Sequence, residues 1–353
     1  MQVFAVHGPG EPVKEIEVPT PELAGKEVIV HITHSGVCHS DVHCQEGHFD
    51  LGSAGKLPIA ASGVQWPAVF GHEIVGTVVA AGPEATVQPG DTQYIVFPWI
   101  GCGKCQACRE DRENYCPRGR NLSVGLRGGF AREVWVPDER YLIELGDLDP
   151  AWGATLACSG VTSYSAVNKV LPRGEEDVVA VIGAGGVGLM AVAILNALGH
   201  KKIAVVDVSD ENLEIAKKLG ATITFNSKVE NPTAGLIEAA GGKIAAAIDF
   251  VNNGATASMA LGALQKGGQL VSVGLFGGEH TYPTTLLALQ VFTIQGNFVG
   301  SLPELKAVVE LARTHDLPQL PIVELPLSAD NINASLEDLA AGKSRGRTVL
   351  VAD

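Results

Sequence analysis

An uncharged stretch of 22 residues, Val178–Gly199, constrains the fold of this chain more than any other feature. It begins with β-branched residues, continues through a cluster of glycines and ends in a run rich in alanine and leucine. A membrane-spanning helix needs about 20 apolar residues, so the length alone would permit one. The central glycines favour a buried strand, a glycine turn and a buried helix instead, and we prefer that interpretation.

Strand and helix patterns alternate from about residue 157 to residue 296. Such alternation indicates a doubly wound parallel sheet and therefore an α/β fold. Asp210 can cap the second helix, which would stop at Gly220. The expected strands are Val178–Ile182, Ile203–Val208, Ala245–Val251 and Gln269–Val273, and the expected helices are Gly186–Leu198 and Asp210–Leu219.

The turn after the first of these strands carries a dinucleotide-binding pattern. Its sequence, Gly183-Ala184-Gly185-Gly186-Val187-Gly188, fits G-x-G-x-x-G between a strand and a helix. The first glycine permits a tight turn, the second lets the backbone approach a pyrophosphate, and the third lets the helix pack on the strand. The free N–H groups of the helix N-terminus can bind the anion. We therefore expect a dinucleotide at this turn.

Asp207 indicates which dinucleotide is bound. It follows Gly188 by 19 positions and ends the next expected strand. A carboxylate there accepts hydrogen bonds from ribose hydroxyls and repels a 2′-phosphate, so NAD is favoured over NADP. FAD-binding chains share the pattern, but they normally carry it near the N-terminus, whereas here it lies midway along the chain.

The rest of the chain has a different pattern. Residues 1 to about 156 contain short β-like runs such as Glu27–Ile32, Ile74–Ala80 and Phe130–Val136, separated by glycine and proline turns. This pattern predicts a mostly antiparallel, partly barrel-like domain. We expect residues 1–156 and 297–353 to form one domain and residues 157–296 the other.

The C-terminal part contains two further signals. Ser301 and Glu304 form a capping-box pattern that would open a helix towards His315. The tail then ends in a strand-like run that includes Arg345–Leu350. We expect this tail to belong with the first domain.

Charge and cysteine content limit the class of protein. With 25 basic and 39 acidic residues the net charge is −14, which disfavours a nucleic-acid partner and a DNA-binding zinc module. The apolar run at the N-terminus, Met1–Val6, is too short for a secretory signal. We therefore expect a cytoplasmic protein whose seven cysteines serve metal binding or catalysis instead of disulfides.

Four of the cysteines form the most specific pattern in the chain, which reads Cys102-x2-Cys105-x2-Cys108-x7-Cys116. Thiolates this close together can surround a tetrahedral Zn²⁺, and four ligands leave no open position, so the metal would be structural. An iron–sulfur cluster is the alternative, because ferredoxins also cluster their cysteines. Lys104 and Arg109 could offset the negative charge of four thiolates around one zinc ion.

Three other segments carry potential metal ligands, and each is ambiguous by itself. They are Cys38-His39-Ser40-Asp41-Val42-His43, Gly71-His72-Glu73 and Cys158-Ser159-Gly160-Val161-Thr162. With the four cysteines and the glycine turn, they occur in the order seen in the zinc-containing medium-chain alcohol dehydrogenases, which the chain resembles over nearly its whole length. The resemblance implies a GroES-like catalytic domain beside a Rossmann domain, two zinc ions per chain, and NAD-linked oxidation of primary or secondary alcohols.

The resemblance also implies roles for individual residues. A catalytic zinc would be bound by Cys38, His72 and Cys158, a ligand set for which alcohol dehydrogenase is the standard example. Glu73 would approach this zinc when its ligands exchange, and Asp41 would orient the histidine ligand. Ser40 and His43 would relay the proton that the alcohol releases. The expected cofactor contacts are His39 and Arg347 at the pyrophosphate and Thr162, Val273 and Gly274 at the nicotinamide.

The chain also departs from the family pattern. Cys38 and His72 are 34 positions apart, more than is typical of the family, and the extra segment near Leu51–Gln65 would lie beside the substrate cleft. Asn212 stands where a cation often lies near the adenosine ribose. The insertion found in animal dimers is absent, which suggests a homotetramer. Trp66 and Trp99 are candidates for the alcohol pocket, and Cys44 matches no ligand position.

Other functions on the same scaffold remain open at this point. A polyol or aromatic-alcohol dehydrogenase would share all these motifs. A zinc-free quinone reductase would lack the four-cysteine pattern, and a non-enzymatic, crystallin-like protein would be expected to have lost the catalytic ligands. The presence of Cys38, His72 and Cys158 favours an enzyme.

Overall fold

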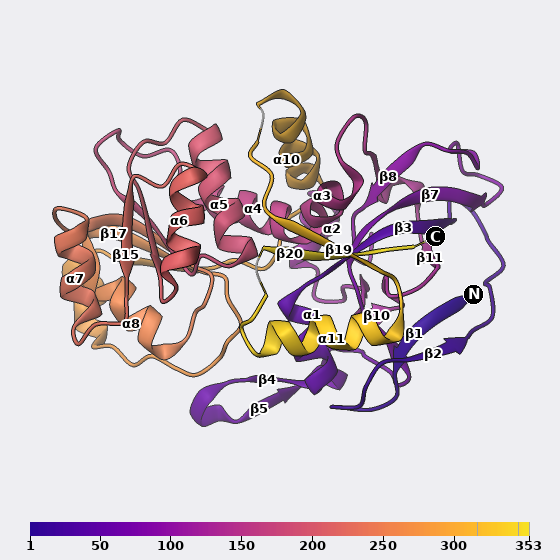
Figure 1. Cartoon of the computed structure of the whole chain (residues 1–353), viewed down its shortest axis with the longest axis horizontal. Coiled ribbons are helices and arrows are strands. Elements are labelled where there is room, and N and C mark those ends of the chain that lie inside the picture. Colours follow the sequence, from indigo (N-terminus) through magenta and orange to yellow (C-terminus); the bar gives the residue numbers. More distant parts are fainter. Residues whose placement is uncertain (316, 345, 353) are drawn as a thin grey trace.

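The structure is a computed structural model that describes residues 1–315, 317–344 and 346–352. Two large sheets lie side by side (Figure 1), one built from the middle of the chain and the other from its two ends. The expected α/β fold, with a parallel Rossmann sheet and a GroES-like part, is confirmed. The domain boundaries at residues 156 and 297 stay a prediction.

The Rossmann sheet has six parallel strands in the order β15-β14-β13-β16-β17-β18. Its central strand is buried on both faces, since Val179 and Val181 pack into one apolar cluster and Ala180 and Ile182 into another. The strands are β13 (Val179–Ile182), β14 (Ile203–Asp207), β15 (Ile223–Asn226), β16 (Ile244–Asp249), β17 (Leu264–Ser272) and β18 (Thr293–Gly296). The accompanying helices are α5 (Gly186–Ala197), α6 (Asp210–Lys218), α7 (Pro232–Ala239), α8 (Gly254–Ala263) and α9 (Thr284–Gln290).

Some element ends differ from the expected ones. The cap of α6 is Ser209, not Asp210, because the Ser209 hydroxyl accepts a hydrogen bond from the Asn212 N–H at 3.3 Å. Asp210 is the first helical residue, where its negative charge interacts favourably with the positive end of the helix dipole. Strand β3 continues to Val37, well past the expected end at Ile32, because strands on either side pair with it.

The second sheet has seven strands, six of them in the order β12-β8-β7-β3-β20-β19, with β11 also paired to β3. The C-terminal tail supplies β19 and β20, and β20 pairs antiparallel with β3, so the tail does return to the N-terminal part. Arg345 lies outside the described residues. The strands are β3 (Val28–Val37), β7 (Glu73–Ala81), β8 (Gln93–Val96), β11 (Glu133–Val136), β12 (Leu142–Glu144), β19 (Ile322–Pro326) and β20 (Arg347–Val351).

A helical path connects the two sheets. It consists of α3 (Pro150–Thr155), a π-helical turn (Leu156–Gly160) and α4 (Val161–Val170). A π turn within a helix is rare and frequently lies at a functional site. Farther along, Ser301 and Glu304 form the expected capping box of α10 (Leu302–Thr314). Another helix, α11 (Ala329–Ala340), lies between β19 and β20 in the chain.

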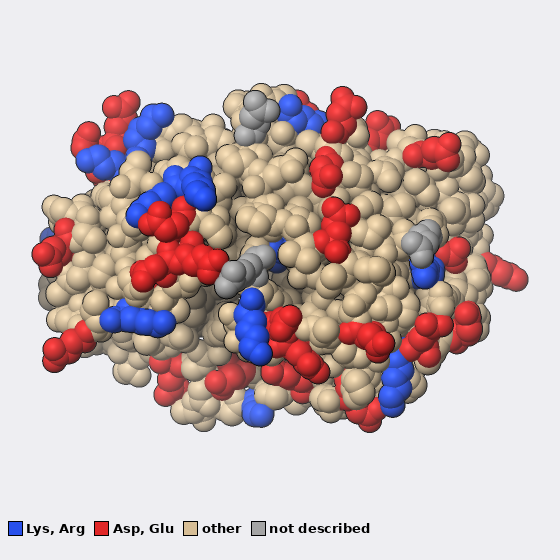
Figure 2. Space-filling model, viewed as in Figure 1, with Lys and Arg blue, Asp and Glu red and all other residues tan. Residues whose placement is uncertain are grey.

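The surface agrees with the acidic composition. Figure 2 shows acidic side chains scattered over the face drawn, with fewer basic side chains among them. Among the described residues, no helix is long and apolar enough to cross a membrane. The uncharged stretch at Val178–Gly199 forms β13, a turn and α5, as expected from its glycines.

Candidate active site

Strand pairing brings the three dispersed ligand candidates together. Cys38 caps α1 (His39–Glu46) directly after β3, and His72 directly precedes β7. Because Gly36 of β3 pairs with Glu73 of β7, the end of one strand lies beside the start of the other. Cys158 reaches the same point from the π turn. The two thiol sulfurs are 4.0 Å apart, and the three ligand atoms lie within 4.8 Å of one another.

The chemistry of this cluster fits a metal ion. Asp41 Oδ1 lies 3.2 Å from His72 Nδ1, and Asp41 also accepts hydrogen bonds from the N–H groups of Cys38 and Gly71. These contacts orient the imidazole. Its other nitrogen, Nε2, is buried and has no hydrogen-bond partner among the described residues. A buried polar atom without a partner is costly, and a metal ion between it and the thiols would satisfy it.

The two thiols differ in acidity. The hydrogen bond from Cys158 lowers the pKa of the Cys38 thiol well below its usual value. The same contact, with burial, raises the pKa of Cys158. The contact between the two sulfurs therefore favours ionisation of Cys38 over ionisation of Cys158. Deprotonated thiols are the form that binds zinc.

Glu73 and Arg347 form a buried ion pair beside the ligands. Burial raises the pKa of Glu73 to about 7, although the charge of Arg347 opposes this effect. Burial alone would lower the pKa of Arg347, but the charges of Glu73 and Cys38 raise it above the usual value. A Cβ built on Gly186 would lie 2.5 Å from Arg347 Cδ, so this side chain passes directly against the glycine turn.

A single cavity of about 720 Å³ joins the cluster to the Rossmann sheet. From the GroES-like part it is lined by Cys38, His72 and Cys158 and by His39, Ser40 and His43. From the other side it is lined by Thr162, Val187, Val273 and Gly274. The hydroxyl oxygen of Thr162 is buried without a partner among the described residues, as a group reserved for a ligand would be. Three of the predicted catalytic-metal residues (Cys38, His72 and Cys158) therefore share one space with the predicted relay and nicotinamide residues, whereas Glu73 does not line it.

The extra segment lies beside this cavity, as expected. It folds into β4 (His48–Asp50), β5 (Lys56–Pro58) and two short 3₁₀ turns (Gly52–Ala54 and Ile59–Ser62). Its end, from Ile59 to Gly63, contributes to the cavity wall. Trp99 also lines the cavity, whereas Trp66 lines a separate pocket of about 410 Å³. Of the two tryptophans, only Trp99 can therefore contact an alcohol in this cavity.

The glycine turn has the geometry that a dinucleotide requires. Gly183 has φ of 90°, a left-handed conformation that favours glycine. A Cβ on Gly188 would lie 1.8 Å from the Gly183 carbonyl oxygen, so only glycine lets the helix approach. A Cβ built on Gly185 would meet no atom of the described residues within 4 Å, so the backbone there is open to an approaching cofactor. Asp207 accepts hydrogen bonds from Ala184 N at 2.6 Å and Ser209 N at 2.8 Å, so its carboxylate faces the turn.

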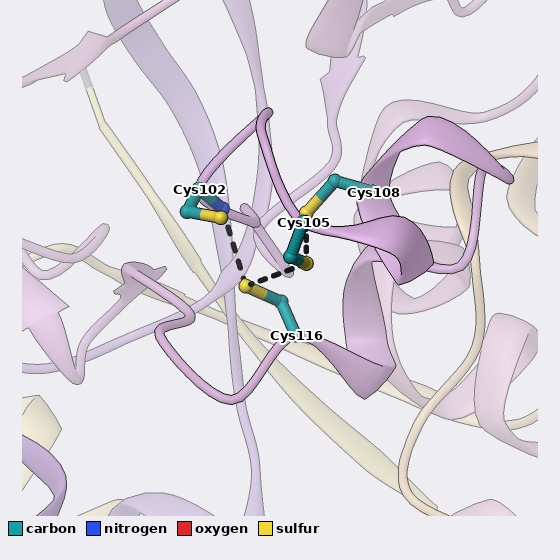
Figure 3. A group of neighbouring side chains, drawn as sticks. All are labelled: Cys102, Cys105, Cys108 and Cys116. Atoms are coloured by element: carbon teal, nitrogen blue, oxygen red, sulfur yellow. Dashed lines mark hydrogen bonds between the residues drawn. The ribbon is translucent and has the colours of Figure 1, made fainter.

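The four cysteines converge on one point of a surface lobe (Figure 3). Cys105 Sγ lies 3.5 Å from Cys108 Sγ and 3.7 Å from Cys116 Sγ, and the backbone N–H of Cys102 donates to Cys116 Sγ. The lobe has only a four-residue helix, α2 (Gln106–Arg109), and a 3₁₀ turn (Glu113–Tyr115). Because it has almost no apolar core, a metal ion would be its main stabilising element.

Comparisons with known proteins identify the family of this chain. Residues 24–147 match the alcohol dehydrogenase GroES-like domain, and residues 186–314 match the zinc-binding dehydrogenase family. An NAD-dependent alcohol dehydrogenase of Sulfurisphaera tokodaii is 35% identical over 97% of both chains. A protein of the same name from Saccharolobus solfataricus is 33% identical over the same shares. The chain belongs to the zinc-containing medium-chain alcohol dehydrogenase family.

A solved structure of a family member gives the same result. The crystal structure of the alcohol dehydrogenase of Aeropyrum pernix superposes with a TM-score of 0.89 at 29% identity, covering 99% of this chain and 100% of the other. The present chain and the Aeropyrum pernix enzyme therefore share one fold over nearly their whole length.

Two residues of the present chain that lie at the candidate metal clusters were not predicted from its sequence. Ser123 donates a hydrogen bond to the Gly71 carbonyl and lies 3.5 Å from His72 Nδ1, so it helps to fix the ligand loop. Arg118 also lies beside the four-cysteine cluster, with its Nη2 3.9 Å from Cys102 Sγ. The charge-offsetting role of Lys104 and Arg109 stays a prediction. No motif surrounds Ser123. Arg118 follows Cys116 by two positions, and this spacing could have predicted a cation beside the cluster.

Proposed function

We propose that this chain is a zinc-dependent alcohol dehydrogenase that transfers a hydride from a primary or secondary alcohol to NAD, reversibly with the aldehyde or ketone. The observation that supports this most strongly is the orientation of His72 Nε2. It is buried and unpaired among the described residues, and the ligand atoms of His72 and the two cysteines lie within 4.8 Å of one another. The cavity that these residues line is also lined by Val187 of the glycine turn. This arrangement suits an open-sided Cys₂His metal site facing a nicotinamide.

We infer two zinc ions per chain. Cys38, His72 and Cys158 would bind the catalytic ion, with Glu73 as an exchangeable ligand, and Cys102, Cys105, Cys108 and Cys116 would bind the structural ion. The catalytic ion, when bound, lowers the pKa of an alcohol hydroxyl and so favours the alkoxide that releases hydride. None of the seven cysteines, all of which are among the described residues, forms a disulfide, and metal-binding cysteines are typical of reducing compartments, so we propose the cytoplasm.

The protein's own residues would bind the reactants and move the proton. The hydroxyl of Ser40, 3.8 Å from Cys38 Sγ, can take the alcohol proton. His43 lies one turn along the same helix, where burial lowers the pKa of its imidazole, so a neutral base is available. Its Nδ1 is 3.7 Å from the exposed carboxylate of Glu46, which offers a route to water. His39, Arg347, Thr162, Val273 and Gly274, with the glycine turn, would hold NAD.

A substrate panel measured together with metal content tests the proposal. Ethanol, 2-propanol, benzyl alcohol and sorbitol are each supplied with NAD or NADP, and zinc is measured by elemental analysis on the same sample. We expect two zinc ions per chain and NAD reduction with the simple alcohols. Turnover of sorbitol alone would indicate the polyol alternative. A protein with two zinc ions that oxidises none of these alcohols would contradict the proposal.

Asp207 should determine cofactor choice. Replacing Asp207 with alanine removes the charge-assisted hydrogen bonds expected from the ribose hydroxyls, each worth about 1.5–3 kcal/mol. We therefore expect KM for NAD to rise about 10- to 100-fold. The preference for NAD over NADP should become smaller. Asp210→Ala is the control, since Asp210 instead accepts from the Asn226 amide on the surface. An unchanged KM for NAD in Asp207→Ala would contradict the assignment.

We infer that the chain forms a homo-oligomer, with a tetramer favoured. Strand β18 is the edge of the Rossmann sheet, and all its residues are exposed. Beside it, α9 has no buried residue, and Leu289 and Val291 are each 60% exposed. An unprotected edge strand is a template for pairing with a second chain, and the exposed apolar side chains of Leu289 and Val291 favour such contact. Light scattering should give the mass of four chains, and a monomeric mass at micromolar concentration would contradict this inference.

A further inference from the structure

Asn297 links two segments of the active-site cavity wall through its side-chain amide. Its Nδ2 donates to the carbonyl of Thr162 at 3.4 Å and to the carbonyl of Val299 at 3.2 Å. Thr162 belongs to α4, the helix that follows the Cys158 turn, whereas Val299 belongs to the loop after β18. Asn297 is 8% exposed and lines the cavity with both partners.

Lys169 fixes the orientation of this amide. Its ammonium donates to Asn297 Oδ1 at 2.6 Å and to the Ser165 hydroxyl at 3.0 Å. An ammonium group can only donate, so the oxygen of the amide must face Lys169 and the nitrogen must face the two carbonyls. The lysine therefore prevents the amide from flipping, although it does not line the cavity itself.

The loop held in this way has a strained backbone. Val299 has φ of 43°, which is an outlier for a β-branched residue. Such a conformation persists only where the surroundings determine it, and it occurs often at ligand sites. The neighbouring Phe298 carbonyl accepts a hydrogen bond from the Asn114 amide at 3.0 Å, so the loop is held from both sides. Phe298 and Val299 both form part of the cavity wall.

We propose that Asn297 is a positioning residue for the nicotinamide end of the cavity. Its amide, oriented by Lys169, holds the strained Phe298–Val299 wall at a fixed distance from Thr162. This inference rests on the proposed function, which assigns that end of the cavity to the cofactor. If the amide is lost, the loop can relax towards an ordinary backbone conformation, and both NADH binding and hydride transfer should weaken.

Asn297→Asp tests this directly, because aspartate keeps the size and the Lys169 contact but cannot donate to the two carbonyls. Two lost hydrogen bonds predict a roughly tenfold or larger rise in the NADH dissociation constant, measured by fluorescence titration. A slight misplacement of the nicotinamide should also lower kcat by about tenfold or more. Lys169→Met should also raise the NADH dissociation constant, but by less. Lys169→Arg can still donate to Oδ1 and should bind NADH as the wild-type protein does.

Asn333→Asp is the matched control. The Asn333 side chain also holds a backbone segment at two points, accepting from Val13 N at 2.8 Å and donating to Val13 O at 3.1 Å, but it does not line the cavity. It should lower the thermal midpoint of the cofactor-free protein while leaving the NADH dissociation constant unchanged. Equal thermal losses in Asn297→Asp and Asn333→Asp, with normal NADH binding in both, would overturn the proposal.

The remaining outcomes are also decisive. If Asn297→Asp does not fold, normal NADH binding by Lys169→Met would overturn the inference. If the wild-type protein binds NADH but oxidises no alcohol, the proposed function fails and the binding titrations still test Asn297. If the wild-type protein binds no NADH, both the function and this inference are overturned.

Discussion

Cys38→Ala is expected to reduce alcohol-dependent reduction of NAD by about 10³-fold or more. The substitution removes one of the three cysteine and histidine ligands proposed for the catalytic zinc, so this ion should be lost and elemental analysis should return about one zinc ion per chain in place of two. Lewis-acid stabilisation of an alkoxide is worth several kcal/mol, and each 1.36 kcal/mol corresponds to a factor of ten in rate. NADH binding, measured by fluorescence, should be largely retained because the glycine turn and Asp207 are unchanged.

Cys44→Ala is the matched control for this prediction. Cys44 is also buried and lines the same cavity, but its sulfur is not part of the Cys38–His72–Cys158 cluster. Burial raises the pKa of this thiol, which makes it a poor ligand. The control should keep both zinc ions and nearly normal turnover. Normal turnover by Cys38→Ala itself would refute the catalytic assignment.

The second large effect is expected from Cys105→Ser. Its sulfur is in contact with those of Cys108 and Cys116, so the substitution should release the structural ion while leaving the catalytic one. Structural zinc contributes folding free energy directly, and this lobe has almost no core to replace it. We expect the thermal midpoint to fall by roughly 10 °C and proteases to cut within residues 102–116.

Gln106→Ala provides the comparison within the same lobe. Its side chain is exposed and donates only to Glu110, so zinc content and thermal midpoint should be unchanged. If the wild-type protein shows the visible absorption of an iron–sulfur cluster, the four cysteines bind such a cluster instead of zinc. A Cys105→Ser protein that keeps two zinc ions and the wild-type midpoint would contradict a structural metal in the lobe.

Features encoded within a short segment could be predicted from the sequence. The glycine turn, its flanking strand and helix, and the four-cysteine lobe each depend on residues within about 20 positions, and the structure has each where it was expected. Element ends were less predictable, because they depend on contacts made elsewhere. Strand β3 extends to Val37 through pairing with β7 and β20, which its own residues do not indicate.

The sequence by itself determined the residue types that carry the proposed chemistry: a glycine turn with an acidic partner, a four-cysteine lobe, and the cysteines and histidine of a second candidate metal site. Only the tertiary structure decided that Cys38, His72 and Cys158 meet, that Arg347 reaches Glu73, and that Asn297 contacts Thr162 in the cavity wall. The physical reason is that these contacts join residues far apart in the chain. The meeting of Cys38 with His72, and of Glu73 with Arg347, depends on the register of β3 against β7 and β20, and register is a property of paired strands.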